Sequence, residues 1–386
     1  MTARARSGGS LHPVLPPVLA RVPGQGGAIA FLAGAAVRPH HAYVLAGPEG
    51  SGKSLAARAF AASLLCPDGG CGGCRDCRLA LGDRHPNEFV VEPEGRDIHV
   101  DTVREEIWQP AFRTAPEPGR KIFVLREADR LSPAAADTLL KVLEEPPADT
   151  VFLLLSARAH ELPETIWSRC HVVTFTALPE YFVVRQLLDE SVDEVRARLA
   201  ARLTGGNLGR ARRLATGGDG LAFREAAERA VELAGQEPAG ALEAATVVLD
   251  AAAGYKKAMK GELDRELAPF LDDKGRPEEA YRGAIKRVET RFHRRERRAE
   301  RDYVDWVLLA VSSLLRDRIA VGVGVGAEVD LLLNPDLAPV AGSVPAAAAG
   351  LAGIEEARAE LAEEFNLNVR LVLERAFLRL ALASGR

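Results

Sequence analysis

Short apolar runs alternate with helical patterns over roughly the first 175 residues of the chain. The runs are AYVLA (42–46), EFVVE (88–92), IFVL (122–125), VFLLL (151–155) and HVVTF (171–175). Continuous apolar runs of this length, separated by helices, are typical of parallel strands that are buried on both faces. The pattern therefore predicts an α/β domain in which helices cover both faces of a five-stranded parallel sheet.

Beyond Leu178 the strand signals fade and helical periodicity takes over. Three helical stretches follow, and Gly205-Gly206 ends the second of them. The remainder of the chain is rich in Ala and Leu and is also helical. We interpret the chain as an α/β domain (1–177), a small helical lid (178–218) and an all-α domain (219–386).

Composition and charge narrow the class of protein. Hydrophobic residues make up 47% and charged residues 27% of the chain, which is ordinary for a soluble globular protein. The net charge of -4 gives no global attraction to nucleic acid, so such binding would need a local patch or a partner chain. No apolar run approaches the ~20 residues that span a bilayer. Pro13, Pro16 and Pro17 interrupt the early apolar stretch, so we expect a cytosolic protein without a signal peptide.

A phosphate-binding loop directly follows the first predicted strand. Its residues are Gly47, Pro48, Glu49, Gly50, Ser51, Gly52, Lys53 and Ser54, and they fit G-x-x-x-x-G-K-[ST] in full. The glycines let backbone N–H groups surround phosphate oxygens, and the start of the next helix adds partial positive charge. Lys53 would reach the β- and γ-phosphates, and the Ser54 hydroxyl would bind Mg²⁺. The motif predicts ATP binding, with a chance glycine-rich turn as the alternative.

Four of the five cysteines lie close together in the sequence. Cys66, Cys71, Cys74 and Cys77 form C-x4-C-x2-C-x2-C. In a reducing cytosol this cluster indicates metal ligands rather than disulfides, with free thiols as the alternative. Four thiolates would close a tetrahedral shell around Zn²⁺ and leave no position for a catalytic water, so we predict a structural zinc. Cys170 is interpreted as a small buried residue.

The end of the third strand raises the question of hydrolysis. In P-loop enzymes such a strand usually ends in an Asp that helps to hold Mg²⁺, whereas here Arg126 and Glu127 follow it. An inward-pointing Arg126 would repel a unit positive charge ~4 Å away by about 4 kcal/mol at an effective dielectric of ~20. It could instead bind phosphate or point outward. An extended chain would carry Asp129 about 10 Å past the strand end, so replacing the missing Asp would require a local bend. We predict weak or absent hydrolysis, with Glu127 as a vestigial catalytic residue.

Several motifs together resemble the AAA+ subunits of the bacterial sliding-clamp loader of the DNA polymerase III holoenzyme. They are the phosphate loop in HAYVLAGPEGSGKS, the cysteine module, LLKVLEEPP (139–147) and LPETIWSRC (162–170). The resemblance covers about residues 22 to 216, and the remaining residues agree in length and helical character only. It implies a AAA+ domain with an inserted zinc module at 66–77, the lid, and an oligomerisation collar.

The family has two main types of AAA+ subunit. The gamma/tau type hydrolyses ATP, and its strand corresponding to IFVL ends in Asp-Glu. The stator type completes the ring and offers an arginine finger to its neighbour. The motor type also has a γ-phosphate-sensing arginine in the lid, where this chain has Gly209 before Arg210. Arg126 and Gly209 therefore favour the stator type, with the gamma/tau motor as the alternative.

The resemblance also implies roles for two further residues and a set of partners. Ser156 fills the polar sensor position after the fourth strand, and Arg169 would be the finger that stabilises negative charge in the neighbouring subunit. The alternative for Arg169 is a surface salt bridge. The expected partners are gamma/tau and delta subunits in a hetero-oligomer and, through the complex, the sliding clamp and primer-template DNA. The chain itself would not be a polymerase. A AAA+ DNA-processing protein outside polymerase III is a third hypothesis.

Three remaining features are given structural interpretations. The stretch 286–301 contains eight Lys/Arg against three Glu. It could contact DNA phosphates or an acidic partner, but we favour a solvated helix with Glu–Arg pairs. We expect Trp108, Trp167 and Trp306 to lie in the core, and residues 339–350 to form a loop.

Overall fold

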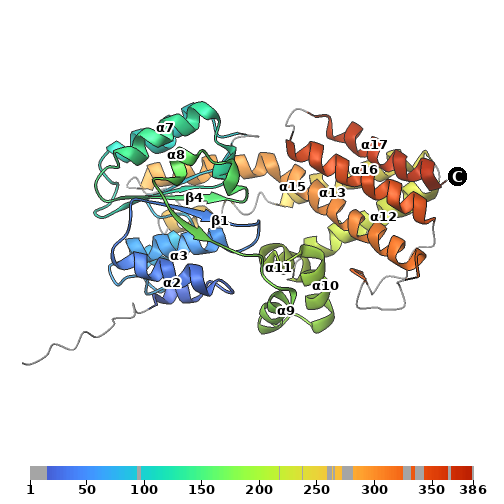
Figure 1. The fold of residues 1–386 in the computed structure, drawn as a ribbon, viewed down its shortest axis with the longest axis horizontal. Helices are drawn as coiled ribbons and strands as arrows, with labels where there is room; N and C mark the ends of the chain where they lie inside the picture. Colours follow the sequence, from blue (N-terminus) through green and yellow to red (C-terminus); the bar gives the residue numbers. More distant parts are fainter. Residues whose placement is uncertain are drawn as a thin grey trace, which may run out of the picture.

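A five-stranded parallel sheet forms the centre of the N-terminal part of the chain (Figure 1). The computed structural model describes residues 15–93, 97–216, 218–236, 238–258, 263, 266–271, 281–324, 332–334, 343–363 and 367–384. The strands are β1 (Ala42–Ala46), β2 (Glu88–Val91), β3 (Lys121–Leu125), β4 (Thr150–Ser156) and β5 (His171–Thr174). Their order is β2-β3-β4-β1-β5, and every pair is parallel. The predicted sheet and α/β class are therefore confirmed.

Alternating strand residues enter two hydrophobic clusters, one on each face of the sheet. On β1, Tyr43 and Leu45 belong to one cluster, whereas Ala42 and Val44 belong to the other. This double burial explains why the strands read as continuous apolar runs. Helices of the first cluster are α1 (Pro17–Ala20), α2 (Gly26–Val37), α3 (Lys53–Leu65) and α4 (Arg75–Leu81). Those of the second are α5 (Val100–Val103), the π-helical η1 (Arg104–Trp108), α6 (Gln109–Phe112), α7 (Pro133–Glu144) and α8 (Glu164–Trp167).

The rest of the described chain is helical. A small group of helices beside the sheet comprises α9 (Glu180–Asp189), α10 (Glu194–Thr204) and α11 (Leu208–Thr216). A bundle with its own core comprises α12 (Gly218–Gln236), α13 (Gly240–Ala258), α15 (Arg282–Gly322), α16 (Val344–Glu363) and α17 (Val369–Ser384). Part of the predicted loop at 339–350 is wrong, because residues from Val344 onward form the start of α16. Ala346 and Ala347 are buried there, and residues 339–342 lie outside the described part.

The long helix α15 links the bundle to the α/β domain, running from behind the sheet into the bundle (Figure 1). In its first half, Arg287 donates to the Pro86 carbonyl (2.6 Å) and Arg291 to the Asp83 carbonyl (2.7 Å). Arg294 binds both carboxylate oxygens of Glu106 at 2.5 and 2.9 Å. The favoured solvated helix is wrong for these arginines, because they dock the helix onto the domain.

Apolar packing reinforces this docking. Leu79 of α4 is buried with Phe270 and with Ala284 and Val288 of α15. We call the contact between the first half of α15 and residues 79–93 and 97–106 the junction. It makes one packed unit of the sheet and the beginning of the bundle.

The tryptophan prediction is only partly correct. Trp108 is 44% exposed, so placing it in the core was wrong. It lies on the π-helical turn, and its ring is 5.3 Å from that of the exposed Phe112. Trp167 and Trp306 are half-buried and pack against core clusters. Within the described residues, none of the helices is long and apolar enough to cross a membrane.

The junction yields a stability prediction. Arg291→Ala leaves the buried Asp83 carbonyl without its donor, at a cost of about 1–3 kcal/mol. We expect a fall of about 2–8 °C in the thermal unfolding midpoint by calorimetry. The matched control is Lys286→Ala, an exposed position on the same helix, which should change the midpoint by about 1 °C or less. Equal effects of the two variants would contradict a structural role for Arg291.

Candidate nucleotide and zinc sites

The phosphate loop connects β1 to α3 with a backbone that requires glycine. At Gly47, a Cβ would lie 2.2 Å from the Phe175 carbonyl oxygen. At Gly50, where φ is +74°, a Cβ would lie 2.0 Å from the Asn207 side chain. Gly52, in the left-handed region, precedes Lys53, the first residue of α3, so a helix begins directly after the loop as the motif predicts. The loop is therefore closely packed against the end of β5 and against the turn before α11.

Lys53 is folded back into its own loop. Its Nζ donates to the carbonyl oxygens of Gly47 (2.5 Å) and Pro48 (2.7 Å). Burial lowers the pKa of Lys53, while the charges of Glu49 and Asp129 oppose that shift. The hydrogen bonds that the structure gives this ammonium group therefore go to two backbone carbonyls of the loop. Ser54, the next residue, is exposed.

Two side chains hold the loop from outside. The amide of Gln25 donates to the Ser51 carbonyl (2.9 Å) and to the Thr176 carbonyl (2.7 Å), which ties the loop to the residues after β5. From α11, Arg210 binds Glu49 at 3.1 Å and approaches Asp305 of α15 at 3.9 Å. The loop, α11 and the bundle are therefore connected through Arg210.

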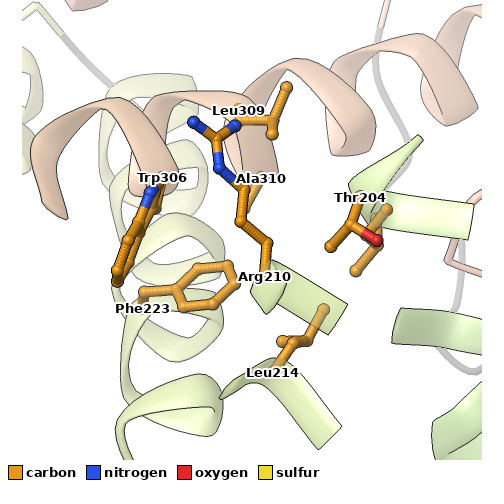
Figure 2. Close-up of a pocket in the computed structure, with 8 residues that line it drawn as sticks. Thr204, Arg210, Leu214, Phe223, Trp306, Leu309 and Ala310 are labelled. Carbon is orange, nitrogen blue, oxygen red and sulfur yellow. The ribbon is translucent and has the colours of Figure 1, made fainter. Parts of the chain in front are cut away.

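Figure 2 shows Arg210 beside a small cavity where α10 and α11 meet the bundle. Its side chain passes Phe223, and its guanidinium group reaches α15 near Leu309. The cavity is about 30 Å³ and mostly apolar in lining. That volume suits about one water molecule, so this cavity is not a nucleotide site.

At the end of β3, the side chain of Arg126 forms salt bridges with two carboxylates. Its backbone N–H donates to Val91 (2.9 Å), so the residue continues the pairing with β2. Its guanidinium group binds Asp83 at 2.6 Å and Glu92 at 2.5 Å, and Arg58 of α3 binds the same Asp83 oxygen at 2.6 Å. Burial would raise the pKa of Asp83, but Arg126 and Arg58 outweigh it and hold that pKa well below its usual range. We did not identify Asp83 or Glu92 from the sequence.

The chain bends sharply directly after Arg126. Glu127 has φ 51°, which is unusual for a residue with a side chain, and the 3-10 turn η2 (Ala128–Arg130) follows. The bend brings Asp129 back, so that its carboxylate accepts a 2.7 Å hydrogen bond from Ser156. The extended-chain estimate for Asp129 was therefore wrong. The Glu127 carboxylate is instead paired with Arg130 at 2.9 Å.

Arg169 lies on the surface after α8. It binds Glu144 of α7 at 2.6 Å and donates to the Thr165 carbonyl (2.9 Å) and to the Ser168 hydroxyl (3.1 Å). Its side chain remains 34% exposed. The salt bridge is thus present, and it also fixes the direction of an accessible guanidinium group. The neighbouring Cys170 is half-buried, and burial raises its pKa to about 12.

The four cysteines meet at one point. The Sγ atom of Cys66 lies 3.8 Å from that of Cys71 and 3.6 Å from that of Cys74. The Sγ atoms of Cys71 and Cys77 are 4.0 Å apart. A tetrahedron with Zn–S bonds of ~2.3 Å has S–S edges of about 3.8 Å. Backbone N–H groups of Gly72 and Cys77 point at two of the sulfurs, each at 3.3 Å. The geometry therefore fits a closed, structural Zn²⁺ site.

A second cluster of metal-ligand types contains Asp76, His85 and Glu117. It could not be read from the sequence, because its members are widely separated. The backbone N–H of Asn87 donates to His85 Nδ1 (3.1 Å), so the neutral ring carries its proton on Nε2, facing the carboxylates. Arg75 also binds both acids, at 2.9 and 3.1 Å. This cluster is best explained as an ion-pair network.

Sequence comparisons agree with the motifs. The family profile described as "DNA polymerase III, delta subunit" matches residues 33–179. DNA polymerase III subunit delta' of Pseudomonas aeruginosa is 40% identical over 203 residues, covering 50% of this chain and 60% of the relative. The delta' subunit of Bacillus subtilis is 34% identical over 173 residues, covering 43% and 51%. Over the matched part, the chain is therefore similar to delta' subunits of DNA polymerase III.

The chain is also similar to gamma/tau subunits over a shorter stretch. The gamma/tau subunit of Mycobacterium bovis is 34% identical over 148 residues, which is 37% of this chain and 25% of that protein. Among solved structures, a gamma-subunit-related protein of Thermotoga maritima covers 89% of this chain and 95% of its own, with a TM-score of 0.44 and 16% identity. The chain spans between 51% and 60% of the length of the delta' relatives from P. aeruginosa, B. subtilis and Escherichia coli.

The cysteine geometry yields a metal prediction. We expect the purified protein to carry one zinc per chain by elemental analysis. Cys71→Ala should lose the metal and lower the thermal unfolding midpoint, because a structural zinc contributes to folding. Cys170→Ala removes a thiol outside the cluster and should keep the zinc. Full zinc occupancy in Cys71→Ala would contradict the assignment.

Proposed function

We propose that the protein is the delta' stator of a DNA polymerase III clamp loader, the complex that loads the sliding clamp onto primed DNA. In this role it binds ATP with little or no hydrolysis and supplies Arg169 to the nucleotide of a neighbouring subunit. The observation that carries the proposal is the binding of Arg126 to Asp83 and Glu92. The position that holds Mg²⁺ in related motors is thereby part of an internal ion-pair network.

Two further features argue against turnover in the protein's own site. A general base must come within hydrogen-bond reach of the attacking water, and Glu127 is turned into the left-handed bend and paired with Arg130. At the position of the lid sensor, Gly209 has no side chain with which to contact a phosphate. The binding loop is thus intact while the groups for hydrolysis are altered or displaced.

Arg169 suits a role in trans. A guanidinium group is permanently charged and binds phosphate oxygens in a bidentate manner, which stabilises charge in phosphoryl transfer. Glu144 and the Thr165 carbonyl orient the group at the surface, and it is one-third exposed. A phosphate from a neighbour would compete with Glu144 for the same donors. The two contacts also reduce the rotamer entropy lost on binding.

The junction supports a stator rather than a moving part. Arg287, Arg291 and Arg294 attach α15 to the α/β domain, while the second half of α15 belongs to the bundle. In the proposed assembly, residues 178–218 act as the lid and residues 219–386 as the collar.

The proposed partners are gamma/tau and delta subunits. Contacts with the clamp and primer-template DNA would arise through the complex. The gamma/tau-type motor remains the alternative function.

The finger assignment gives a test by reconstitution with gamma-type and delta subunits. Arg169→Ala should lower the ATP turnover of the complex by at least tenfold, by analogy with the value of such fingers in other phosphoryl-transfer systems. The chain alone should show little turnover. Arg104→Ala, an exposed arginine elsewhere on the α/β domain, is the matched control and should leave turnover unchanged. Unchanged turnover in Arg169→Ala would remove the finger from the proposal, and brisk turnover by the chain alone, lost on Lys53→Ala, would favour the motor.

Arg126 gives a second test, because restoring the usual Asp should fail. Arg126→Asp would place a third acid beside Asp83 and Glu92 and remove their shared cation. Breaking a buried pair costs about 3–5 kcal/mol, so we expect a marked fall in the unfolding midpoint and no gain in ATP turnover. Arg126→Met, which removes the cation without adding an acid, should be less destabilising. A stable, hydrolytic Arg126→Asp protein would refute the structural role of Arg126.

A further inference from the structure

Asp129 is a carboxylate beside the phosphate loop that the usual motif does not provide. Ser156, at the end of β4, lies opposite Ala46 in the β1–β4 register, and the Gly47 N–H donates to the Ser156 carbonyl at 3.2 Å. Ser156 is thus adjacent to the first residue of the loop. Because the Ser156 hydroxyl donates to Asp129 at 2.7 Å, the carboxylate is placed at the floor of the same site.

Asp129 is a buried carboxylate with few partners among the described residues. Its side chain is only 4% exposed. The partners given by the structure are the neutral Ser156 hydroxyl and Arg158, whose nitrogen is 3.4 Å away and whose side chain is 52% exposed. The charge of Asp129 also acts on the Lys53 ammonium group. The charged partners that the structure gives this carboxylate are thus the partly exposed Arg158 and the Lys53 ammonium group of the phosphate loop.

These donors match what Mg²⁺ requires next to a nucleotide. Magnesium is usually held by one or two carboxylates together with phosphate oxygens and water, rather than by a complete protein cage. The strand end provides no carboxylate, since Arg126 stands there, but the bend at Glu127 provides one three residues later. Ser54, the hydroxyl residue of the loop motif, is exposed on the first turn of α3.

We infer that Asp129 replaces the missing strand-end acid and, with the Ser54 hydroxyl, holds Mg²⁺ against the phosphates of bound ATP. The inference rests on the ATP binding in the proposed function. It concerns binding alone, because Glu127 remains paired with Arg130 and is not positioned to activate water. The site then holds Mg²⁺–ATP as a lasting ligand instead of consuming it.

A purely structural role for Asp129 makes a different prediction. If Asp129 only positioned Ser156, the affinity for ATP would not depend on Mg²⁺ through this side chain. Asp129→Asn keeps the size and an oxygen acceptor for Ser156 but removes the charge. Asp129→Glu keeps the charge with a longer side chain. The two variants therefore separate the charge from the hydrogen bond.

The experiment measures the affinity of the full chain for a fluorescent ATP analogue with excess Mg²⁺ and with EDTA. We expect Mg²⁺ to tighten binding roughly tenfold in the wild type, and by less than about twofold in Asp129→Asn. Asp129→Glu should retain part of the Mg²⁺ effect. Asp137→Asn, at an exposed position on α7, is the matched control and should behave as the wild type. Thermal unfolding of each variant checks that it is folded.

Two results would overturn the inference. One is a full Mg²⁺ effect in Asp129→Asn, and the other is no Mg²⁺ effect in the wild type. If Asp129→Asn does not fold, the Asp129→Glu variant is compared with the wild type by the same measure, the ratio of the affinity with Mg²⁺ to the affinity with EDTA. The Lys53→Ala variant tests the proposed function separately. If this substitution does not change the nucleotide affinity, the phosphate loop is not the ATP site and the proposed function loses its ATP binding.

Discussion

The salt bridges from Arg126 to Asp83 and Glu92 are the interaction on which this site depends. A buried ion pair adds little net stability compared with apolar packing, but losing one partner is costly. Once Arg126 holds two acids, the strand end can no longer return to an Asp by one substitution. The same Asp83 accepts from Arg291 of α15 through its carbonyl, so the altered strand end and the junction share one residue.

In the proposed function, this arrangement separates nucleotide binding from turnover in physical terms. The loop keeps the glycine geometry, the ammonium and the helix start that attract phosphate. The groups that would act on water are redirected: Glu127 pairs with Arg130, and Gly209 has no side chain. Catalytic chemistry is then expected at Arg169, which lies on the surface and is oriented by Glu144. The protein would contribute positive charge to the reaction in a neighbouring subunit, whereas its own nucleotide site would remain rigid.

The sequence predicted the elements well, because apolar runs and the glycine motif are local signals. It predicted all five strands, the helix that follows the phosphate loop, and the cluster of cysteines that meet in space. Contacts between distant segments could not be predicted in this way. The partners of Arg126 lie 34 and 43 residues earlier in the sequence. The bend at Glu127 has a positive φ, but no glycine stands at that position to indicate a bend. The basic stretch was misread because its partners, such as Glu106, lie 188 residues away.

The measurement that tests the central claim most directly is the identity of the nucleotide that the isolated chain retains. The protein would be loaded with ATP and Mg²⁺, freed of unbound nucleotide, incubated for several hours and denatured, and the released nucleotide separated by chromatography. The account predicts a near-stoichiometric yield of unchanged ATP. Release of mainly ADP would show turnover in the protein's own pocket, and recovery of no nucleotide would show that the intact loop does not bind it; either result would contradict the account.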